Sequence, residues 1–599
     1  MKQEFQVTCP FCAVGCRFKI LKGQDDVVFS GRTRDAIDYD YENPVNEGAL
    51  CPRGHFAYEL LSHPQRLGRS YYKSNGSLQP QITELIFENI AANLKKESFP
   101  SPMAILANPL LSLHDIRTIL EFAVNMKLQA IDFIMPADRH LFRALLDVPF
   151  SFSRCDDARL LKNMNHVLYM GDVFTKQPVL SRHMLKAKYA FRKNGFYTIN
   201  PIPGKTSWFS NIHIQNTPHH EPLHLFYLLN TALELKKSSR LSDEQIWLGD
   251  FIRKDVLPII TEFVPPAQLV SLKRIAEVLA SNQKSAIFYS THLYNAAGSY
   301  LSGMACAALA QISDSSFIPL YTDGNLYAIE ELSRDAFKKL DIGRKPLLYH
   351  LLQNKYQYIY AIGWNPESAY PGVMDWPDGS SWIISSLVKD QFPENTKALL
   401  AQAYLYEQMD LRTSFLPWQS QGSPAVKTPI GSAQSLSHLT YLLNQKLSEK
   451  NITLAGNGVE PYRKDWTTAL QEEFSYYRQQ LERQTAAPGK WLIPADHQIH
   501  YGDGQLTQFS SWAAVEHENK QMKLSAEEAA ALKVENEQYF NITHNGKRIV
   551  FKSQIDENLP PNVLVPNSHY LPARRMMSGE FAEHNREYYF WCPKIRTNE

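Results

Sequence analysis

The sequence has 599 residues, 44% hydrophobic and 21% charged, and its 62 basic residues nearly balance 61 acidic ones. A chain of this length is too long for one hydrophobic core, so several structural units are expected. The balanced charge argues against a nucleic-acid partner, and no apolar run approaches the roughly 18 residues that span a bilayer. We therefore expect a cytoplasmic protein with no direct membrane span.

Four cysteines near the amino-terminal end form the first recognisable pattern. Cys9, Cys12 and Cys16 have the spacing C-x2-C-x3-C, and Cys51 follows after 34 further residues. Four converging thiolates can hold a [4Fe–4S] cluster or a zinc ion, because both prefer sulfur ligands in a tetrahedral array. A compact trio with one distant cysteine is typical of cluster sites, whereas zinc ribbons use two separate C-x2-C pairs. The spacing favours the cluster and keeps zinc as the alternative.

These residues also carry a family resemblance. The segments CPFCAVGC at residues 9–16 and NPVNEGALCPRGHFAYELLSHPQRL at residues 43–67 resemble the amino-terminal cluster domain of the molybdopterin oxidoreductase family. That family includes formate dehydrogenases, nitrate reductases and the large iron–sulfur subunit of NADH–quinone oxidoreductase (complex I). The resemblance implies that residues 1–70 form a [4Fe–4S] domain and that Arg53 lies beside the cluster. A salt bridge is the alternative role for Arg53.

Residues 71–455 alternate between short apolar runs and helical patterns. The runs at residues 102–108, 166–172, 285–291 and 358–368 resemble buried parallel strands that end in turn residues. This alternation predicts doubly wound α/β units, so the fold class is α/β. The resemblance implies that the two Rossmann-like subdomains of this body are interleaved.

Residues 456–599 differ in pattern from the body. Strand-like alternation, an Asn545-Gly546 hairpin signal and the Pro560-Pro561 pair predict a linker followed by a small β-barrel. The approach to the barrel, YGDGQLTQFSSW at residues 501–512, resembles the complex I subunit more than the formate dehydrogenases.

The second half of the body retains residues for a dinucleotide. Phosphates bind where strand ends meet helix N-termini, because free backbone N–H groups and the helix dipole favour anions there. The resemblance implies that a molybdopterin guanine dinucleotide would contact Gly363, Asn365, Pro366, Asp390 and Thr396. Ordinary α/β turns are the alternative interpretation.

The first half departs from the family pattern at two positions. Asp172 stands where a neutral asparagine is expected, and Asn200 stands where the family has a carboxylate. A carboxylate beside a pyrophosphate costs free energy through like-charge repulsion. We therefore expect that the chain does not bind two complete pterin dinucleotides.

The segment that carries the catalytic metal ligand in the family also differs in this sequence. Catalytic relatives place Cys, selenocysteine or Ser on molybdenum or tungsten upstream of the first strand turn, and residues 131–143 contain no thiol. Asp138 and His140 lie there instead and are the candidate catalytic residues, with a salt-bridged turn as the alternative. Cys155 is a further, less favoured metal ligand, and the i, i+4 pair His220 and His224 is interpreted as a helix start.

These observations favour an iron–sulfur electron-transfer subunit that lacks the catalytic metal and works in a larger redox complex like the complex I subunit. Its partners would be iron–sulfur, flavin or quinone-linked subunits, and the complex could hold it at the periphery of a membrane. The first alternative is a complete molybdenum or tungsten enzyme of formate dehydrogenase type. The second is a non-redox scaffold with a structural zinc site.

Overall fold

The structure is a computed structural model. It describes residues 3–23, 36–94, 103–108, 110–128, 130–133, 136–153, 155, 158–236, 241–281, 283–322, 325–326, 329, 332–333, 336, 347–353, 356–363, 379–389, 392–413, 420–447, 465–502, 504, 506–516 and 519–597.

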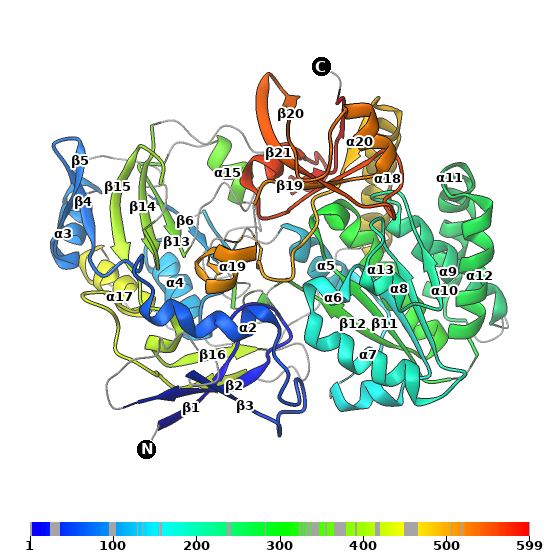
Figure 1. Cartoon of the computed structure of the whole chain (residues 1–599), viewed down its shortest axis with the longest axis horizontal. Helices are drawn as coiled ribbons and strands as arrows, with labels where there is room; N and C mark the ends of the chain where they lie inside the picture. Colours follow the sequence, from blue (N-terminus) through cyan, green and yellow to red (C-terminus); the bar gives the residue numbers. More distant parts are fainter. Residues whose placement is uncertain are drawn as a thin grey trace.

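The amino-terminal residues form a small antiparallel sheet below the two larger sheets (Figure 1). Its strands are β1 (Gln3–Thr8), β2 (Arg17–Lys22) and β3 (Ile37–Tyr39). The short helix α2 (Pro52–Phe56) and the 3-10 helix η1 (Ala57–Ser62) follow. Cys9 and Cys16 pack into the same apolar core as Tyr169 and Val179, which belong to the five-stranded sheet and its covering helix. This contact fixes the amino-terminal unit against the body.

A five-stranded parallel sheet lies on the right of Figure 1 in the order β10-β9-β8-β11-β12. Its strands are β8 (His166–Met170), β9 (Gly195–Ile199), β10 (Ile212–Ile214), β11 (Ser285–Ser290) and β12 (Ser316–Leu320). Its principal helices are α6 (Val173–Lys176), α7 (Pro178–Ala190), α9 (Glu221–Leu235), α12 (Pro266–Leu279) and α13 (Ser299–Ser313). Every residue of β8, β9 and β11 is buried, as expected for parallel strands covered on both faces.

A seven-stranded sheet lies on the left of Figure 1 in the order β5-β4-β15-β14-β13-β6-β7. Its strands are β4 (Tyr71–Ser74), β5 (Ser77–Pro80), β6 (Met103–Ala107), β7 (Ile131–Phe133), β13 (Tyr358–Ile362), β14 (Ser381–Ser386) and β15 (Thr396–Ala401). The chain therefore leaves this sheet after β7, builds the five-stranded sheet, and returns to it at β13.

The carboxy-terminal strands form a six-stranded sheet, a half-barrel with β20 and β25 at its edges, at the top of Figure 1. Its strands are β18 (Lys490–Leu492), β19 (Gln521–Leu524), β20 (Tyr539–His544), β21 (Lys547–Ile555), β22 (Val563–Pro566) and β25 (Lys594–Ile595). Asn545 and Gly546 have φ values of 50° and 72° and join β20 to β21, which confirms the predicted hairpin.

Two small two-stranded sheets are also present among the described residues, β16 (Asp410–Thr413) with β17 (Ser420–Ser423) and β23 (Ser578–Phe581) with β24 (Tyr588–Trp591). The other α-helices of the described residues are α3 (Thr83–Leu94), α4 (Leu113–Asn125), α5 (Pro136–Asp147), α8 (Lys205–Trp208), α10 (Asp243–Phe251), α11 (Leu257–Phe263), α15 (Leu347–Gln353), α17 (Leu436–Leu447), α18 (Trp466–Ala486), α19 (Ser511–Glu516), α20 (Ala526–Leu532) and α21 (Leu571–Arg574).

The expected α/β class is confirmed in its coarse form, a mixed α/β fold with several sheets and a half-barrel. Among the helices of the described residues, none is both long enough and apolar enough to cross a membrane.

Candidate functional site

The four amino-terminal cysteines line one small cavity. Gly15, with φ of 71°, turns the chain tightly between the second and third cysteines, and the Cys9 N–H donates to the Cys16 carbonyl over 2.8 Å. Cys51 reaches the cavity as the residue before α2. The cysteines predicted from spacing are therefore brought together.

The cavity is a poor environment for bare thiolates. Burial raises the pKa of Cys9 and Cys16, and the surrounding cysteines raise both further. Within the described part of the chain, no three or more His, Cys, Asp or Glu side chains close on a point as a single metal ion would require. The four thiols instead surround a volume, and an iron–sulfur core of positive iron ions would neutralise them there.

Arg53 places a buried cation at this cavity. Its side chain is only 4% exposed, and its Nη2 donates to the main-chain oxygens of Thr175 at 3.1 Å and Lys176 at 2.7 Å. Burial lowers the pKa of Arg53, but the thiols of Cys51 and Cys12 outweigh this effect and raise it. The guanidinium therefore stays charged between the cysteines and helix α6.

Lys176 extends this connection to the other side of α6. While its main-chain oxygen accepts from Arg53, its ammonium group donates to the Thr291 carbonyl and lies 3.7 Å from Asp496 Oδ2. Burial alone would raise the pKa of Asp496, but Lys176 and a hydrogen bond from His292 hold it well below its usual range. The carboxylate therefore remains ionised.

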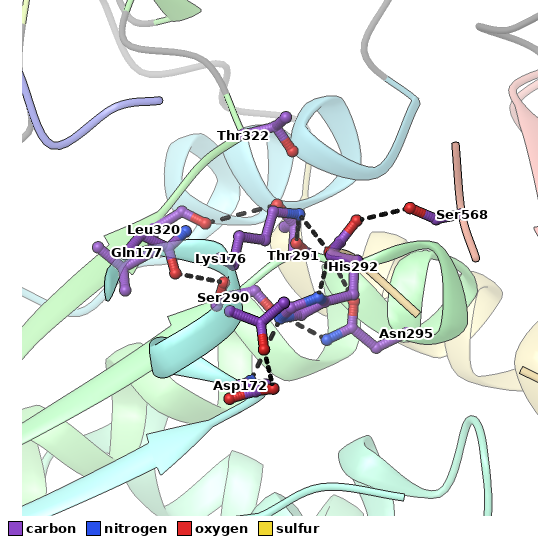
Figure 2. A network of polar contacts seen from close by, with 12 residues as sticks. Asp172, Lys176, Gln177, Ser290, Thr291, His292, Asn295, Leu320, Thr322 and Ser568 are labelled. Atoms are coloured by element: carbon purple, nitrogen blue, oxygen red, sulfur yellow. Dashed lines mark hydrogen bonds and ion pairs between the residues drawn. The ribbon is translucent and has the colours of Figure 1, made fainter. Parts of the chain in front are cut away.

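His292 lies at the centre of the polar network in Figure 2. Its Nδ1 is 2.8 Å from Asp496 Oδ2, and its ring stacks on Tyr294 with 4.7 Å between the centroids. Burial and the nearby Lys176 lower the pKa of His292. In the neutral ring, Nδ1 carries the proton toward Asp496 and Nε2 accepts from the Asp172 N–H at 3.5 Å.

This network lines a large pocket at the carboxyl ends of β8, β9 and β11. Gly171 reaches φ of 115° at the end of β8, and a Cβ there would lie 2.6 Å from His292 Nε2. Asp172 and Asn200 both line this pocket. The Asp172 carboxylate accepts hydrogen bonds from the hydroxyls of Thr175 and Thr206, so both of its oxygens have partners within the protein.

The C-terminal sheet and its connections close the other side of the pocket. Lys205 and Trp208 face it from α8, whereas Lys523, Asp556 and Asn558 come from the tail. Two lysines and an aromatic ring give the pocket groups that can bind phosphate and stack on a base.

The candidate catalytic residues lie in buried contacts of α5. Both oxygens of Asp138 accept from the Thr322 N–H, at 3.0 and 2.9 Å, and Oδ1 also accepts from the Thr291 hydroxyl. Burial raises the pKa of Asp138. His140 stacks on Tyr589 at 4.2 Å, and burial lowers its pKa to about 3. Neither residue is among those lining the large pocket at the strand ends.

The residues predicted for the second half are only partly described. Gly363 directly follows β13 with φ of 81°, and Asn108 packs against it closely enough to contact an added Cβ at 3.2 Å. The Thr396 hydroxyl donates to the Pro393 carbonyl at 2.6 Å. Asn365, Pro366 and Asp390 lie outside the described residues.

Two secondary candidates are packed in apolar or helical surroundings. Cys155 is buried in the apolar core shared with the amino-terminal unit. His220 immediately precedes α9 and His224 lies in its first turns, where His224 Nδ1 contacts the His220 carbonyl at 2.7 Å. The helix start expected here is confirmed.

Sequence reasoning missed the interacting trio of Lys176, His292 and Asp496. Lys176 and His292 each lie a few residues after a buried strand, at the sheet edge where α/β proteins bind ligands. That position was an available signal. Asp496 offered none, because it comes from the distant tail.

Comparison with known proteins agrees with the grouping of the four amino-terminal cysteines. Residues 3–63 match the model of the molybdopterin oxidoreductase Fe4S4 domain. The F420-dependent formate dehydrogenase 2 subunit alpha of Methanococcus maripaludis is 25% identical over 258 residues, covering 40% of this chain and 35% of that protein. The assimilatory nitrate reductase catalytic subunit of Bacillus subtilis is 22% identical over 273 residues, covering 42% and 34%. The matched part thus spans about a third of these relatives.

The fold is similar to acetylene hydratase from Pelobacter acetylenicus, with a TM-score of 0.70, 11% identity, and coverage of 94% of this chain and 92% of that one. Fold and cysteine cavity together define an α/β iron–sulfur protein. The matches show that residues 3–63 resemble the Fe4S4 domain of molybdopterin oxidoreductases and that the chain is similar to members of that family. These relatives are formate dehydrogenases and a nitrate reductase, so the likeness to the complex I subunit stays a prediction.

Proposed function

We propose that the protein is a [4Fe–4S] electron-transfer component of a redox complex, in which Cys9, Cys12, Cys16 and Cys51 hold the cluster. The observation that carries this proposal is the single cavity lined by these four cysteines and by the cationic Arg53. A bound cluster accepts and releases one electron at a time. Arg53 would favour the reduced, more negative state, because its charge is buried beside the cavity.

A structural zinc ion explains the cavity less well. Zinc draws four thiolates to about 2.3 Å from one point. Among the described residues, no three His, Cys, Asp or Glu side chains converge in that way, and a compact trio with one distant cysteine is the spacing typical of cluster sites. We therefore prefer the cluster to the zinc scaffold.

The contacts of Asp138 support an electron carrier without a protein-ligated catalytic metal. Asp138 is buried in contacts with Thr291 and Thr322 and is not among the residues that line the large pocket, so it is not placed to bind a metal there. The Asp172 carboxylate would also repel a pyrophosphate at the end of β8. In the second half, Gly363, Asn365, Pro366, Asp390 and Thr396 remain the proposed contacts for a pterin dinucleotide.

A complete molybdenum or tungsten oxidoreductase is the second candidate. The large pocket at the strand ends, with Lys205, Lys523 and Trp208 at its wall, favours this candidate because these groups suit a nucleotide. If a dinucleotide binds, these residues would hold its phosphates and base. The named nitrate reductase relative is itself a catalytic subunit.

The proposal includes an organisation and partners for the chain. Residues 1–70 would form the cluster domain, residues 71–455 two interleaved Rossmann-like subdomains, and residues 456–599 the linker and barrel-like unit. The single cluster would exchange electrons with iron–sulfur, flavin or quinone-linked subunits, in the cytoplasm or in a complex at the membrane periphery.

Metal analysis of anaerobically purified protein, combined with electron paramagnetic resonance (EPR) of the dithionite-reduced sample, tests these alternatives. The proposal predicts about four irons per chain, a reducible paramagnetic signal, and neither molybdenum nor tungsten. Stoichiometric molybdenum or tungsten with pterin would establish the second candidate. Zinc without iron, in a colourless protein, would establish the scaffold.

A further inference from the structure

Gln177 contributes a buried amide to the wall of the cysteine cavity. It lies between α6 and α7, its side chain is 1% exposed, and it lines the cavity together with the four cysteines. It comes from the five-stranded sheet unit, so the body supplies part of the cluster environment. The proposed function does not use this residue.

Two hydroxyl groups fix the orientation of the amide. The Tyr169 hydroxyl donates to Gln177 Oε1 over 2.9 Å, and the Ser290 hydroxyl donates to the same oxygen over 3.4 Å (Figure 2 shows the Ser290 contact). Tyr169 and Ser290 are both fully buried. Because these hydroxyls hold Oε1 on the side of β8 and β11, Nε2 is directed away from those two strands.

The Nε2 group has no acceptor among the described residues. A buried, unpartnered N–H2 costs free energy, so its presence requires a partner that the protein side chains do not provide. The reversed amide would turn its carbonyl oxygen toward the cysteine sulfurs, which are negative when they bind iron. Electrostatic repulsion therefore favours the orientation in which the N–H2 faces the cavity.

We propose that Gln177 Nε2 donates a hydrogen bond to a sulfur atom of the cluster or of a ligating cysteine, and that this bond raises the reduction potential. The inference rests on the proposed [4Fe–4S] function. A donor to sulfur stabilises the extra negative charge of the reduced cluster more than the oxidised state. Tyr169 and Ser290 act as positioning residues, because their hydroxyl groups donate to the amide oxygen and neither residue lines the cavity.

The test is a redox titration of Gln177→Leu, which keeps the size of the side chain and removes the donor. We expect the reduction equilibrium constant to fall about tenfold, equivalent to about 59 mV for one electron. Gln480→Leu is the matched control, because Gln480 is another buried glutamine, on α18, that does not line the cavity. Its potential should equal that of the wild type.

A spectroscopic measurement separates the hydrogen bond from a general packing effect. In the reduced wild type, electron–nuclear double resonance after growth on ¹⁵N-glutamine should show a weakly coupled nitrogen, and an exchangeable proton that D₂O removes. Both couplings should be absent from Gln177→Leu. If Gln177→Leu assembles no cluster, Gln177→Asn, which shortens the amide, should retain iron and show the same loss of coupling.

The outcomes distinguish the two proposals. A wild-type protein without iron or a reducible signal would overturn the electron-transfer function itself. A wild-type protein with a normal cluster, whose potential and nitrogen coupling are unchanged by Gln177→Leu, would overturn the role of Gln177 and leave the cluster intact.

Discussion

His292 Nδ1 and Asp496 Oδ2 form a 2.8 Å hydrogen bond, although 204 residues separate them in the chain. His292 follows β11 of the five-stranded sheet, whereas Asp496 follows β18 of the carboxy-terminal sheet. The same carboxylate oxygen lies 3.7 Å from Lys176, the residue whose main chain accepts from Arg53. Asp496 therefore links the pocket at the strand ends to Lys176, whose main chain holds Arg53 beside the cysteine cavity.

Removal of this carboxylate should destabilise the protein. Asp496→Asn leaves the Lys176 ammonium group without its ion partner in a largely buried site, so we expect a loss of about 3 kcal/mol in unfolding free energy. Lys176→Met combined with Asp496→Asn should recover at least 1 kcal/mol relative to additivity, as measured by urea unfolding of both single variants and the double variant. If the losses in unfolding free energy of the two single variants simply added in the double variant, Lys176 and Asp496 would not interact as an ion pair.

Glu221 should make stability fall as pH rises from about 4.5 to 7. Burial raises its pKa from the usual 4.5 to about 7, so the folded protein keeps a proton that the unfolded chain releases in this range. Glu221→Gln cannot ionise, and should therefore be more stable than wild type at pH 8 by up to about 3 kcal/mol, with little gain at pH 4. Thermal unfolding across pH would show this difference.

The control for that pH series is Glu557→Gln, which changes an exposed carboxyl group of the same type. Its stability difference from wild type should not vary with pH in the same manner. A Glu221→Gln gain that is equally large at pH 4 and pH 8 would show that packing, rather than ionisation, explains it.

Cys12→Ser should remove most of the iron and the broad absorbance near 400 nm expected of the cluster. An alcohol is a weaker ligand than a thiolate for iron–sulfur centres, and Cys12 lines the cavity. Cys306→Ala is the control, since this thiol is buried in α13 away from the cavity. Iron analysis and anaerobic spectra should show full cluster content in Cys306→Ala. An unchanged spectrum in Cys12→Ser would remove Cys12 from the ligand set.

Arg53→Met should lower the reduction potential, because it removes a buried positive charge that favours the reduced cluster. It also removes the two hydrogen bonds to the main chain of α6, so we expect a stability loss of about 2–3 kcal/mol. Arg53→Lys keeps the charge but not the fork of donors, and its potential should lie nearer to wild type. Equal potentials in all three proteins, measured by redox titration, would refute the charge effect.

The sequence was most informative where structure depends on neighbouring residues. The Cys9–Cys16 loop requires only a tight turn at Gly15. The buried strands β8 and β11 can be recognised in the sequence as apolar runs that end in turn residues. The Asn545-Gly546 hairpin depends on two residues that tolerate positive φ. Each pattern is a local preference, so a single sequence reveals it.

Long-range packing decided the remainder. Asp138 and His140 lie on α5, upstream of β8, and their contacts with Thr322 and Tyr589 could not be inferred without the fold. The pairing of Asp496 with His292 depends on how the tail lies across the five-stranded sheet. Spacing rules carry no information on such contacts, because burial and charge pairing are set by three-dimensional neighbours.

The return of the chain to the seven-stranded sheet has a consequence for how the protein is made. The central strand β13 emerges from the ribosome well after its neighbour β6, with the whole five-stranded sheet synthesised between them. That sheet can therefore assemble first, while β6 and β7 wait for their partners. The wall residues Gln177 to Val179 also follow the last cluster cysteine by more than a hundred positions, so iron delivery to a chain still in synthesis would precede the enclosure that shields it.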